Sequence, residues 1–283
     1  MPSSVIHHNT VKCSLRLLCT NAFSLGNKLA EFQHTLHQHN PDIAVVTETK
    51  FSSETVPPSD STFPGYTTFR LDRTARGGGV AVWIRSTLPA MVIDELFSPH
   101  HELIWLSIQL SPGQKIVLGA AYRPGSTGPS DLTLINHLDD ILPSARALGA
   151  NLILAGDFNV HNRNWLHSSK TTPAGEALED TCTAHFLTQH VQSPTRGDNT
   201  LDLVMSTFNS PVTTQIMSPI GRSDHAVILS DFTGVLPTHE AAVQRTVWRY
   251  EKADWNRLRS FFRQVDWSTV ITPNPETSCE HVT

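Results

Sequence analysis

The sequence has few cysteines, no long apolar run and no recognisable leader. Four cysteines, at positions 13, 19, 182 and 279, are too few for a disulfide framework and lack the paired spacing of a zinc site. The longest apolar runs, such as 152–156, fall far short of the roughly 20 residues that a membrane helix needs. The N-terminus shows no basic segment followed by an apolar stretch. We therefore expect reduced thiols, no membrane partner and no secretory route.

The composition is that of an ordinary globular protein. Hydrophobic residues make up 39% and charged residues 17% of the 283 residues, which excludes collagenous, coiled-coil and wholly disordered chains. The formal net charge is −5, so the chain carries no overall excess of basic residues for a polyanionic partner. Such a partner would require lysine and arginine to gather on one face.

The first half of the chain reads as a layered arrangement of strands with one helix. A strand is predicted at 15–20, an amphipathic helix at 26–39 and a second strand at 42–47. Four further strands are predicted at 66–71, 79–85, 103–110 and 115–122. Because little helix separates these four, we expect them to pair antiparallel.

The second half repeats the mixture of strands and helices. Helices are predicted at 131–148 and 174–188, and strands at 151–156, 200–206, 212–217 and 225–232. The predicted fold class is α/β (α+β): two packed, mainly antiparallel β-sheets flanked by helices, in a four-layered α/β sandwich.

The sequence pattern changes near residue 237. We predict one domain over residues 1–236 and a C-terminal linker over 237–283, with an amphipathic helix inside 247–267. Trp255, Leu258, Phe262 and Val265 would share one face of this helix. The polar end of the chain is either a natural tail or the cut end of a longer protein.

Polar residues with chemical capability recur where the predicted strands begin or end. They are Asn21, Glu48, Tyr122, Asp157, Asn159, Asp202, Asp224 and His225. A single acid after a strand usually caps a helix or forms a turn. Several such residues at the edges of one sandwich instead favour a common site.

These residues lie in motifs that resemble the endonuclease/exonuclease/phosphatase superfamily over residues 12–233. The motifs are TNAFSLGNK, ETK, AAYRPG, GDFNVHN, TLDLV and GRSDHAV. Phrases such as RGGGVAVWI and PTRGDNTLDLV look closer to the apurinic-type endonuclease domain of LINE-type non-LTR retrotransposons. KADWNRLRSFF is similar to the segment that joins that domain to the reverse transcriptase. The resemblance implies a metal-dependent endonuclease.

The resemblance assigns Glu48 and Asn21 to a metal site, with Asp224 as a neighbouring or alternative ligand. Hard oxygen ligands suit Mg²⁺ or Mn²⁺, and magnesium sites use one or two protein carboxylates. Glu48 as a helix cap or an exposed acid after a strand remains the alternative.

Asp157 is predicted to orient or deprotonate the attacking water, with Asn159 donating to a phosphate oxygen. Residues two apart on an extended segment share a side, so both would face one cleft while Phe158 packs inward. The alternative is an Asx turn that closes the strand. Tyr122 would donate its phenol to the phosphate or, alternatively, belong to the core.

His225 cannot pair with Asp224 on one strand face, because neighbours alternate sides. Asp202 is the natural partner: a carboxylate on one ring nitrogen fixes the tautomer and leaves the other nitrogen for the phosphate. We assign His225 to stabilise the phosphorane, whereas a base or acid role remains open.

Other residues give weaker signals. Gly77–Gly79 form either a plain turn or a backbone nest for a phosphate. Thr195 and Arg196 would lie on a protruding hairpin that enters a DNA groove, and Arg123 would touch a phosphate. Ser223 is expected to support the turn before His225.

The function predicted is nicking of one DNA strand by phosphodiester hydrolysis. The 3′-hydroxyl left behind would prime target-primed reverse transcription by a covalently linked reverse transcriptase on the element RNA, as the resemblance implies. The site of action would be the nucleus, after synthesis in the cytoplasm. Two alternatives stay open: a phosphatase of a small phosphoester, which the acidic charge favours, and a DNA-docking module without catalysis.

Overall fold

The computed structural model describes residues 3–7, 14–73, 77–149, 151–235, 243–247 and 254–267. These residues fall into two units. The larger unit holds residues 14–235, and the smaller one holds the strands β1 (Ser3–His7) and β14 (Val243–Val247) with the helix α4 (Trp255–Gln264). Within the described part of the chain, no helix has the length and apolarity that crossing a membrane requires.

The first sheet of the larger unit has six strands in the order β12-β13-β2-β3-β5-β4. Only the neighbours β2 and β3 run parallel, and the other pairs are antiparallel. The strands are β2 (Ser14–Asn21), β3 (Ile43–Thr47), β4 (Tyr66–Leu71), β5 (Val80–Arg85), β12 (Val212–Met217) and β13 (Val227–Thr233).

The second sheet also has six strands, in the order β10-β11-β9-β8-β7-β6. Here β8 and β9 form the one parallel pair. The strands are β6 (Ala90–Val92), β7 (Glu102–Ser111), β8 (Gln114–Tyr122), β9 (Asn151–Asp157), β10 (Thr188–Gln189) and β11 (Asp202–Ser206). All six come from one continuous stretch of chain, between β5 and β12.

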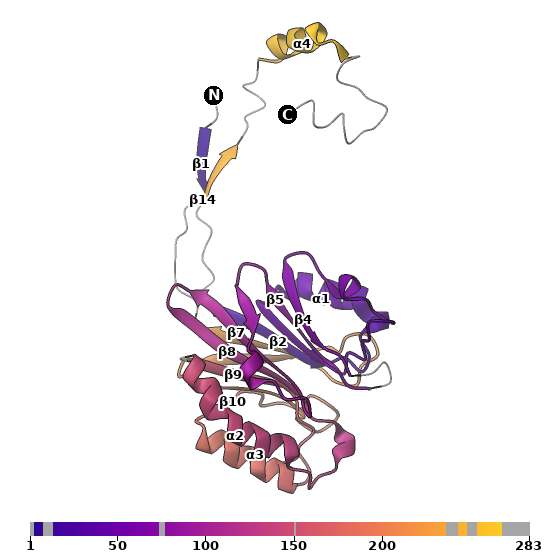
Figure 1. Ribbon diagram of the computed structural model, residues 1–283, viewed down its shortest axis with the longest axis vertical. Coiled ribbons are helices and arrows are strands. Elements are labelled where there is room, and N and C mark those ends of the chain that lie inside the picture. Colours follow the sequence, from indigo (N-terminus) through magenta and orange to yellow (C-terminus); the bar gives the residue numbers. More distant parts are fainter. Residues whose placement is uncertain are drawn as a thin grey trace. The chain divides into compact units, whose positions relative to one another are not determined.

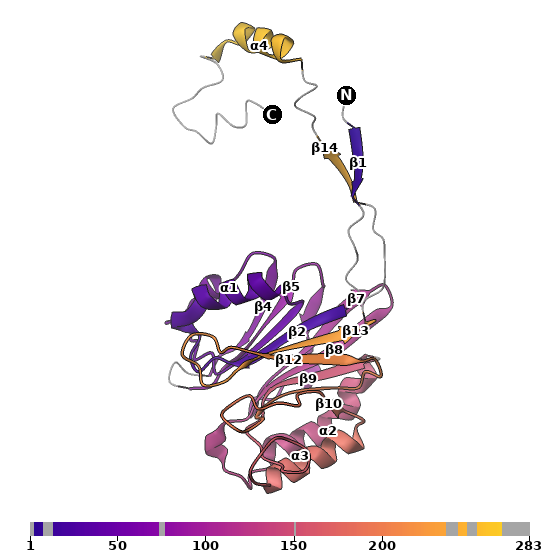
Figure 2. The same ribbon diagram turned by 180° about the vertical axis from the view of Figure 1, so that it is seen from behind.

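Helices cover the outer face of each sheet, and Figures 1 and 2 show the resulting layers. The helix α1 (Leu29–His39) packs Phe32 and Leu36 against the first sheet. The helices α2 (Thr133–Leu148) and α3 (Pro173–Ala184) pack against the second sheet. Between the sheets lies a third apolar cluster, which includes Leu17, Val45 and Leu118. The four-layered sandwich predicted from the sequence is confirmed.

The differences from the prediction are short elements. The edge strands β6 and β10 are too short to leave a period in the sequence, and α3 ends at Ala184 because the chain turns there into β10. Four single-turn 3₁₀ helices were also not predicted. They are η1 (Gly26–Lys28), η2 (Pro58–Ser61), η3 (Asp94–Leu96) and η4 (Gly125–Thr127).

The smaller unit contains an antiparallel pair, β1 with β14, and the helix α4. Asp254 caps α4 by accepting the N–H of Arg257 at 2.9 Å. Trp255, Leu258 and Phe262 of the predicted apolar face are exposed. The domain boundary predicted at 236/237 and the polar tail lie outside the described residues, and so do two of the four cysteines. The described Cys19 and Cys182 are free thiols, as expected.

Candidate active site

Each sheet contributes one pair of parallel strands, and the ends of these pairs carry predicted site residues. Asn21 ends β2, and Glu48 directly follows β3. In the other sheet Tyr122 ends β8 in register with Asp157, the last residue of β9. The carboxyl ends of parallel strands meet at one edge of a sheet. The fold therefore collects four polar side chains at one end of the sandwich.

A chain of hydrogen bonds joins these four residues across the two sheets. Asn21 Nδ2 donates to Glu48 Oε1 at 3.0 Å and to Asp157 Oδ2 at 2.8 Å. The Tyr122 hydroxyl donates to the same Glu48 oxygen at 2.8 Å. Because Asn21 belongs to one sheet and Asp157 to the other, the amide of Asn21 is a direct link between the sheets.

Asp157 and Asn159 lie side by side, but not through the predicted alternation of an extended segment, because β9 ends at Asp157 and the backbone at Asn159 is left-handed. Asn159 Nδ2 donates to Asp157 Oδ2 at 2.9 Å, while Phe158 is buried in the apolar cluster behind the sheet. The Asx turn is present as well, since the N–H of Asn159 donates to Asp157 Oδ1 at 3.0 Å. The turn and the shared face are therefore compatible, and the turn is what holds the two side chains together.

The backbone at two of these residues is left-handed. The φ angle is +48° at Glu48 and +47° at Asn159, a region that residues other than glycine rarely adopt. Such conformations persist only where the surroundings hold them, and they cluster at functional sites. The left-handed backbone thus occurs at two residues of the sequence motifs, Glu48 in ETK and Asn159 in GDFNVHN.

His225 pairs with Asp202, as the alternation argument expected. Asp202 Oδ2 lies 2.7 Å from His225 Nδ1, and both side chains are buried. Asp202 opens β11 directly opposite Asp157, which brings the pair to the same corner. With Nδ1 bonded to the carboxylate, Nε2 is the nitrogen left for another group.

Two acids and one imidazole are buried together at this corner. Burial raises the pKa of Asp157 to about 8, and the charge of Asp202 adds to the rise while His225 and Asn21 oppose it. Asp202 Oδ1 is buried without a hydrogen-bond partner among the described residues. Burial lowers the pKa of His225, but the hydrogen bond and charge of Asp202 outweigh it and raise that pKa overall.

This donor set fits a divalent cation. Asp157, Asp202 and His225 each offer a ligand atom, and these atoms lie within 4.8 Å of one another. Carboxylate oxygens are the ligands that hard cations such as Mg²⁺ prefer, and Asp202 Oδ1 is a buried oxygen without a hydrogen-bond partner among the described residues. The tight cluster differs from the predicted ligand set: Glu48 and Asn21 adjoin it through Asp157, whereas Asp224 does not join the network.

Asp224 instead forms an ion pair with Arg196. Its Oδ2 lies 2.7 Å from both Nε and Nη2 of Arg196, and its side chain is 50% exposed. The other oxygen, Oδ1, lies 4.0 Å from His225 Nε2. Arg196 and Asp224 therefore stand at the rim beside the free nitrogen of His225.

Two predicted DNA contacts are wrong in their side-chain placement. Arg123 is buried, and its guanidinium donates to the backbone carbonyls of Asn159, Gly128 and Asp131. Thr195 is also buried, because its hydroxyl accepts the N–H groups that begin β11. Both side chains therefore hold backbone segments of the site in place.

The predicted protruding hairpin is a two-residue turn. Arg196 and Asn199 pair with each other through backbone hydrogen bonds at 2.9 and 3.0 Å. Only Gly197 and Asp198 lie between them, so the turn has no arm that could reach deep into a groove. Arg196 remains exposed there, where a contact with a phosphate is sterically open.

Lys50 is a site residue that the sequence analysis did not single out. Its Nζ lies 3.7 Å from Glu48 Oε2 and 3.9 Å from the centre of the Phe23 ring. Lys50 belongs to the ETK motif, but the backbone is left-handed at both Glu48 and Lys50, with φ angles of +48° and +52°, so strand alternation could not have placed it. Ser223 supports the turn before His225 as expected: its hydroxyl donates to the Asn21 carbonyl at 2.7 Å.

The three glycines form neither a plain turn nor an open nest: the carbonyls of Gly78 and Gly79 accept the N–H groups of Lys50 and Thr49, and their segment holds a carboxylate. The N–H of Gly79 donates to Glu102 Oε2, and Gly78 and Gly79 adopt φ angles of +71° and +93°. A Cβ atom on Gly78 would come within 2.4 Å of that carboxylate. The protein itself therefore fills the position that a bound phosphate would take.

Comparison with known proteins gives a consistent picture. The sequence profile of the Endonuclease/Exonuclease/phosphatase family matches residues 20–250. No curated protein sequence matches the chain.

Among solved structures, the endonuclease domain of TRAS1, a telomere-specific non-LTR retrotransposon, aligns with a TM-score of 0.62 at 17% identity, covering 78% of this chain and 98% of that one. An AP endonuclease from Archaeoglobus fulgidus aligns with a TM-score of 0.62 at 18% identity, covering 77% and 99%. AP endonuclease LMAP from Leishmania major aligns with a TM-score of 0.58 at 14% identity, covering 78% and 88%. At these identities the likeness concerns the fold.

Proposed function

The chain belongs to the endonuclease/exonuclease/phosphatase family, and from this premise we propose that it is a DNA endonuclease that nicks one strand with Mg²⁺ or Mn²⁺. Hydrolysis of phosphoesters with a divalent metal is the chemistry of the family. The choice of DNA as substrate and of magnesium as the metal is our proposal.

The observation that carries the proposal is the double hydrogen bond of Asn21 to Glu48 and Asp157. It joins the ends of two sheets into one polar network beside the buried pair of Asp202 and His225. A structural role alone would not require two neighbouring buried acids, one of them with an oxygen that has no hydrogen-bond partner among the described residues, because burying polar groups without partners is costly.

Glu48, Asn21 and the carboxylates of Asp157 and Asp202 would hold the metal, which leaves Nε2 of His225 for the phosphate. When bound, a divalent metal neutralises charge on the phosphate and makes water more acidic. Asp157 orients the attacking water and takes its proton. The amide of Asn159, which the sequence analysis assigned to a phosphate oxygen, already donates to Asp157 Oδ2 and to the Arg123 carbonyl, so Asn159 instead holds the carboxylate in place.

His225 and Tyr122 act on the phosphate. Asp202 accepts from His225 Nδ1, so Nε2 faces outward, and the raised pKa keeps the imidazolium available to donate to the phosphorane. Burial raises the pKa of Tyr122, next to the charge of Glu48, so its phenol stays protonated as a donor. Water adds to phosphorus, the P–O3′ bond breaks, and the departing oxygen takes a proton to become the 3′-hydroxyl.

We assign the nick to target-primed reverse transcription in retrotransposition. The support is the set of retrotransposon-like phrases in the sequence and the structural similarity to the TRAS1 domain. In this proposal the partners are DNA, a covalently linked reverse transcriptase and the element RNA. The reaction would take place in the nucleus, after synthesis in the cytoplasm.

A plasmid-nicking assay tests the proposal. The protein is expected to convert supercoiled plasmid to the open circle with Mg²⁺ or Mn²⁺ and to leave ends that a polymerase extends. His225→Ala is expected to be slower by roughly 10²- to 10⁴-fold. Nicking by His225→Ala at the parent's rate would show that the assignment is wrong.

The same assay separates the two alternatives. Hydrolysis of inositol phosphates without nicking would identify a phosphatase of small phosphoesters, which the net charge of −5 favours. Binding of plasmid without metal-stimulated cleavage would identify a docking module. In either case the endonuclease assignment fails.

A further inference from the structure

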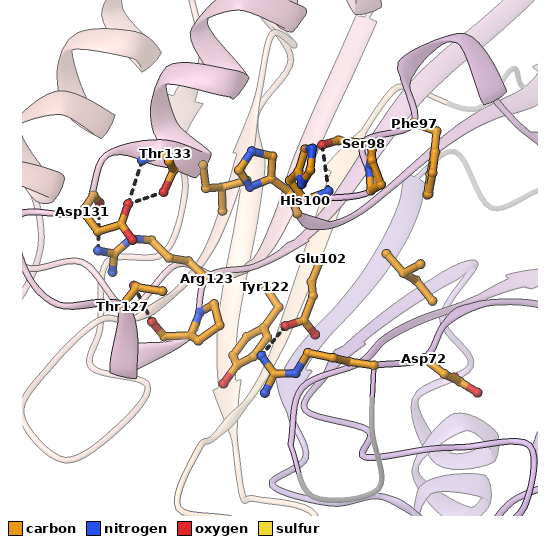
Figure 3. A pocket seen from close by; sticks show the side chains of 16 residues that line it. Asp72, Phe97, Ser98, His100, Glu102, Tyr122, Arg123, Thr127, Asp131 and Thr133 are labelled. Carbon is orange, nitrogen blue, oxygen red and sulfur yellow. Dashed lines mark hydrogen bonds and ion pairs between the residues drawn. The ribbon is translucent and has the colours of Figure 1, made fainter.

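A cavity of about 620 Å³ lies beside the polar network and shares a residue with it. Tyr122 lines this cavity, while its hydroxyl donates to Glu48. The other walls come from the loop after β4, the loop between η3 and β7, the turn after β8 and the start of α2. Figure 3 shows Phe97 and Asp72 toward one end and Thr127 and Asp131 toward the other. The volume lies within the range of small-molecule sites.

The charged side chains on one side of the cavity are paired with each other. Arg73 Nη1 donates to Glu102 Oε1 at 2.7 Å, and the other oxygen of Glu102 accepts the N–H of Gly79. Asp72 accepts from Arg70 at 2.6 Å. These pairs shape the wall and leave it close to neutral.

The charged side chains on the other side are also occupied. Arg123 donates to backbone carbonyls, including that of Asp131 at 3.0 Å. The carboxylate of Asp131 accepts the N–H of Thr133 at 2.9 Å. Each arginine that lines the cavity is thus already paired, so this wall is poorly suited to a second phosphate.

The lining side chains that are left without hydrogen-bond or ion-pair partners in the described part of the chain include an aromatic ring and an imidazole. Phe97 is 56% exposed. His101 stacks on His137 with ring centres 4.7 Å apart, and burial, reinforced by the charge of His137, lowers the pKa of His101. A neutral imidazole offers one donor and one acceptor. Among the described residues, the ring nitrogens of the exposed His100 make no hydrogen bond, so they are open to a ligand.

We propose that this cavity binds one unstacked nucleobase of the DNA strand that is cut. A base is flat, neutral and edged with donors and acceptors, which matches aromatic faces and imidazole nitrogens better than a phosphate or a lipid does. Because Tyr122 reaches both the cavity and the network, the base belongs to a nucleotide next to the cleaved phosphate. The inference rests on the proposed endonuclease function.

A map of nick positions tests the proposal. Parent protein and the variants Phe97→Ala and His100→Ala nick a plasmid library of random sequence, and the bases around each nick are counted. The parent is expected to prefer certain bases at one position beside the nick. Both variants are expected to lose that preference at least fivefold while nicking at a rate within tenfold of the parent.

Phe186→Ala is the matched control, because Phe186 is also an exposed phenylalanine but follows α3 and is not among the lining residues. It is expected to keep the parent's base preference. An unchanged preference in both Phe97→Ala and His100→Ala would overturn the proposal. Failure of the parent to nick at all would instead overturn the proposed function, so the two failures are distinguishable.

A substrate change probes the hydrogen bonds directly. In a duplex oligonucleotide, the preferred base is replaced by an isostere of the same shape without donors and acceptors. The parent is expected to lose about the factor that His100→Ala loses, and the two changes together to cost no more than either alone. If the combined loss equalled the product of the two separate losses, His100 would not contact that base.

A free nucleotide is the other source of the same chemistry. If adenosine monophosphate inhibited the parent but not Phe97→Ala, while the nick maps stayed identical, the cavity would bind free nucleotides and the strand-base proposal would be wrong. No inhibition together with an altered map supports the base of the strand as the occupant.

Discussion

The polar corner, formed by Asp157, Asp202 and His225, and the neighbouring cavity differ in whether the fold provides partners for their acidic side chains. At the corner, Asp157 and Asp202 are buried close together, and one oxygen of Asp202 has no partner among the described residues. In the cavity wall, Glu102 is held by Arg73 and by the N–H of Gly79. An acid whose oxygens have hydrogen-bond partners within the protein supports the structure. An acid with an oxygen that has no such partner is available for a ligand. The contrast predicts opposite results for similar substitutions.

The largest effect is expected at the corner. Asp157→Ala removes the carboxylate that would take the proton of water, so the nicking rate falls by roughly 10²- to 10⁴-fold. Chelation of divalent metal by EDTA is expected to abolish nicking by the parent. The measurement is conversion of supercoiled plasmid over time. A parent that still nicks in EDTA would mean that the corner does not need a metal.

Asp202→Asn is expected to reduce nicking and to raise stability. The amide supports His225 less well, so the rate falls by about 10²-fold. It also removes the charge that helps to raise the pKa of the adjacent Asp157, so the metal-free protein gains about 1 kcal/mol in the free energy of unfolding. Thermal unfolding in EDTA gives the second value. A lower Tm than that of the parent would contradict the view that Asp202 and Asp157 disfavour each other's charge.

Glu102→Ala is expected to have the opposite effect on stability. It leaves the N–H of Gly79 and the Arg73 guanidinium without their acceptor, which costs about 1–3 kcal/mol. Thermal unfolding measures the loss, and Glu95→Ala, an exposed acid in η3, is the control with no expected change. Equal Tm values for Glu102→Ala and the control would remove the contrast between the two regions.

The smallest effect concerns the rim. Arg196 is exposed beside His225, and loss of one phosphate contact lowers the slope of log affinity against log salt by about one unit. The measurement is DNA binding by Arg196→Ala at several salt concentrations in EDTA. Arg146→Ala, on the exposed face of α2, is expected to keep the parent's slope. If the two variants gave the same slope, Arg196 would have no phosphate contact.

Much of the fold and of the polar corner could be predicted from the sequence. Buried strands such as β3 and β9 are clear in the sequence as short continuous apolar runs, and the polar residues at their ends follow from the chain order. The pairing of His225 with Asp202 could be derived because neighbours on a strand point to opposite faces.

The rest depends on side-chain direction and on distant contacts. Arg123 and Thr195 were expected at the surface, but nothing in the local sequence tells that backbone groups of other segments accept or donate to them. The cavity was not predicted because its walls come from several separate connections, and none of them has a periodic pattern. The Asp224–Arg196 pair joins residues 28 positions apart, which a local motif does not reveal.

The link made by Asn21 has a consequence for how the enzyme could be divided. All strands of the second sheet come from the stretch between β5 and β12, while Asn21 and Glu48 belong to the flanking part. Neither portion owns a complete reaction centre, so separately expressed fragments would be inert until they reassemble. If the protein nicks DNA as proposed, the return of nicking when the two fragments are mixed would report their reassembly. Such a split protein would cut DNA only when both fragments are present.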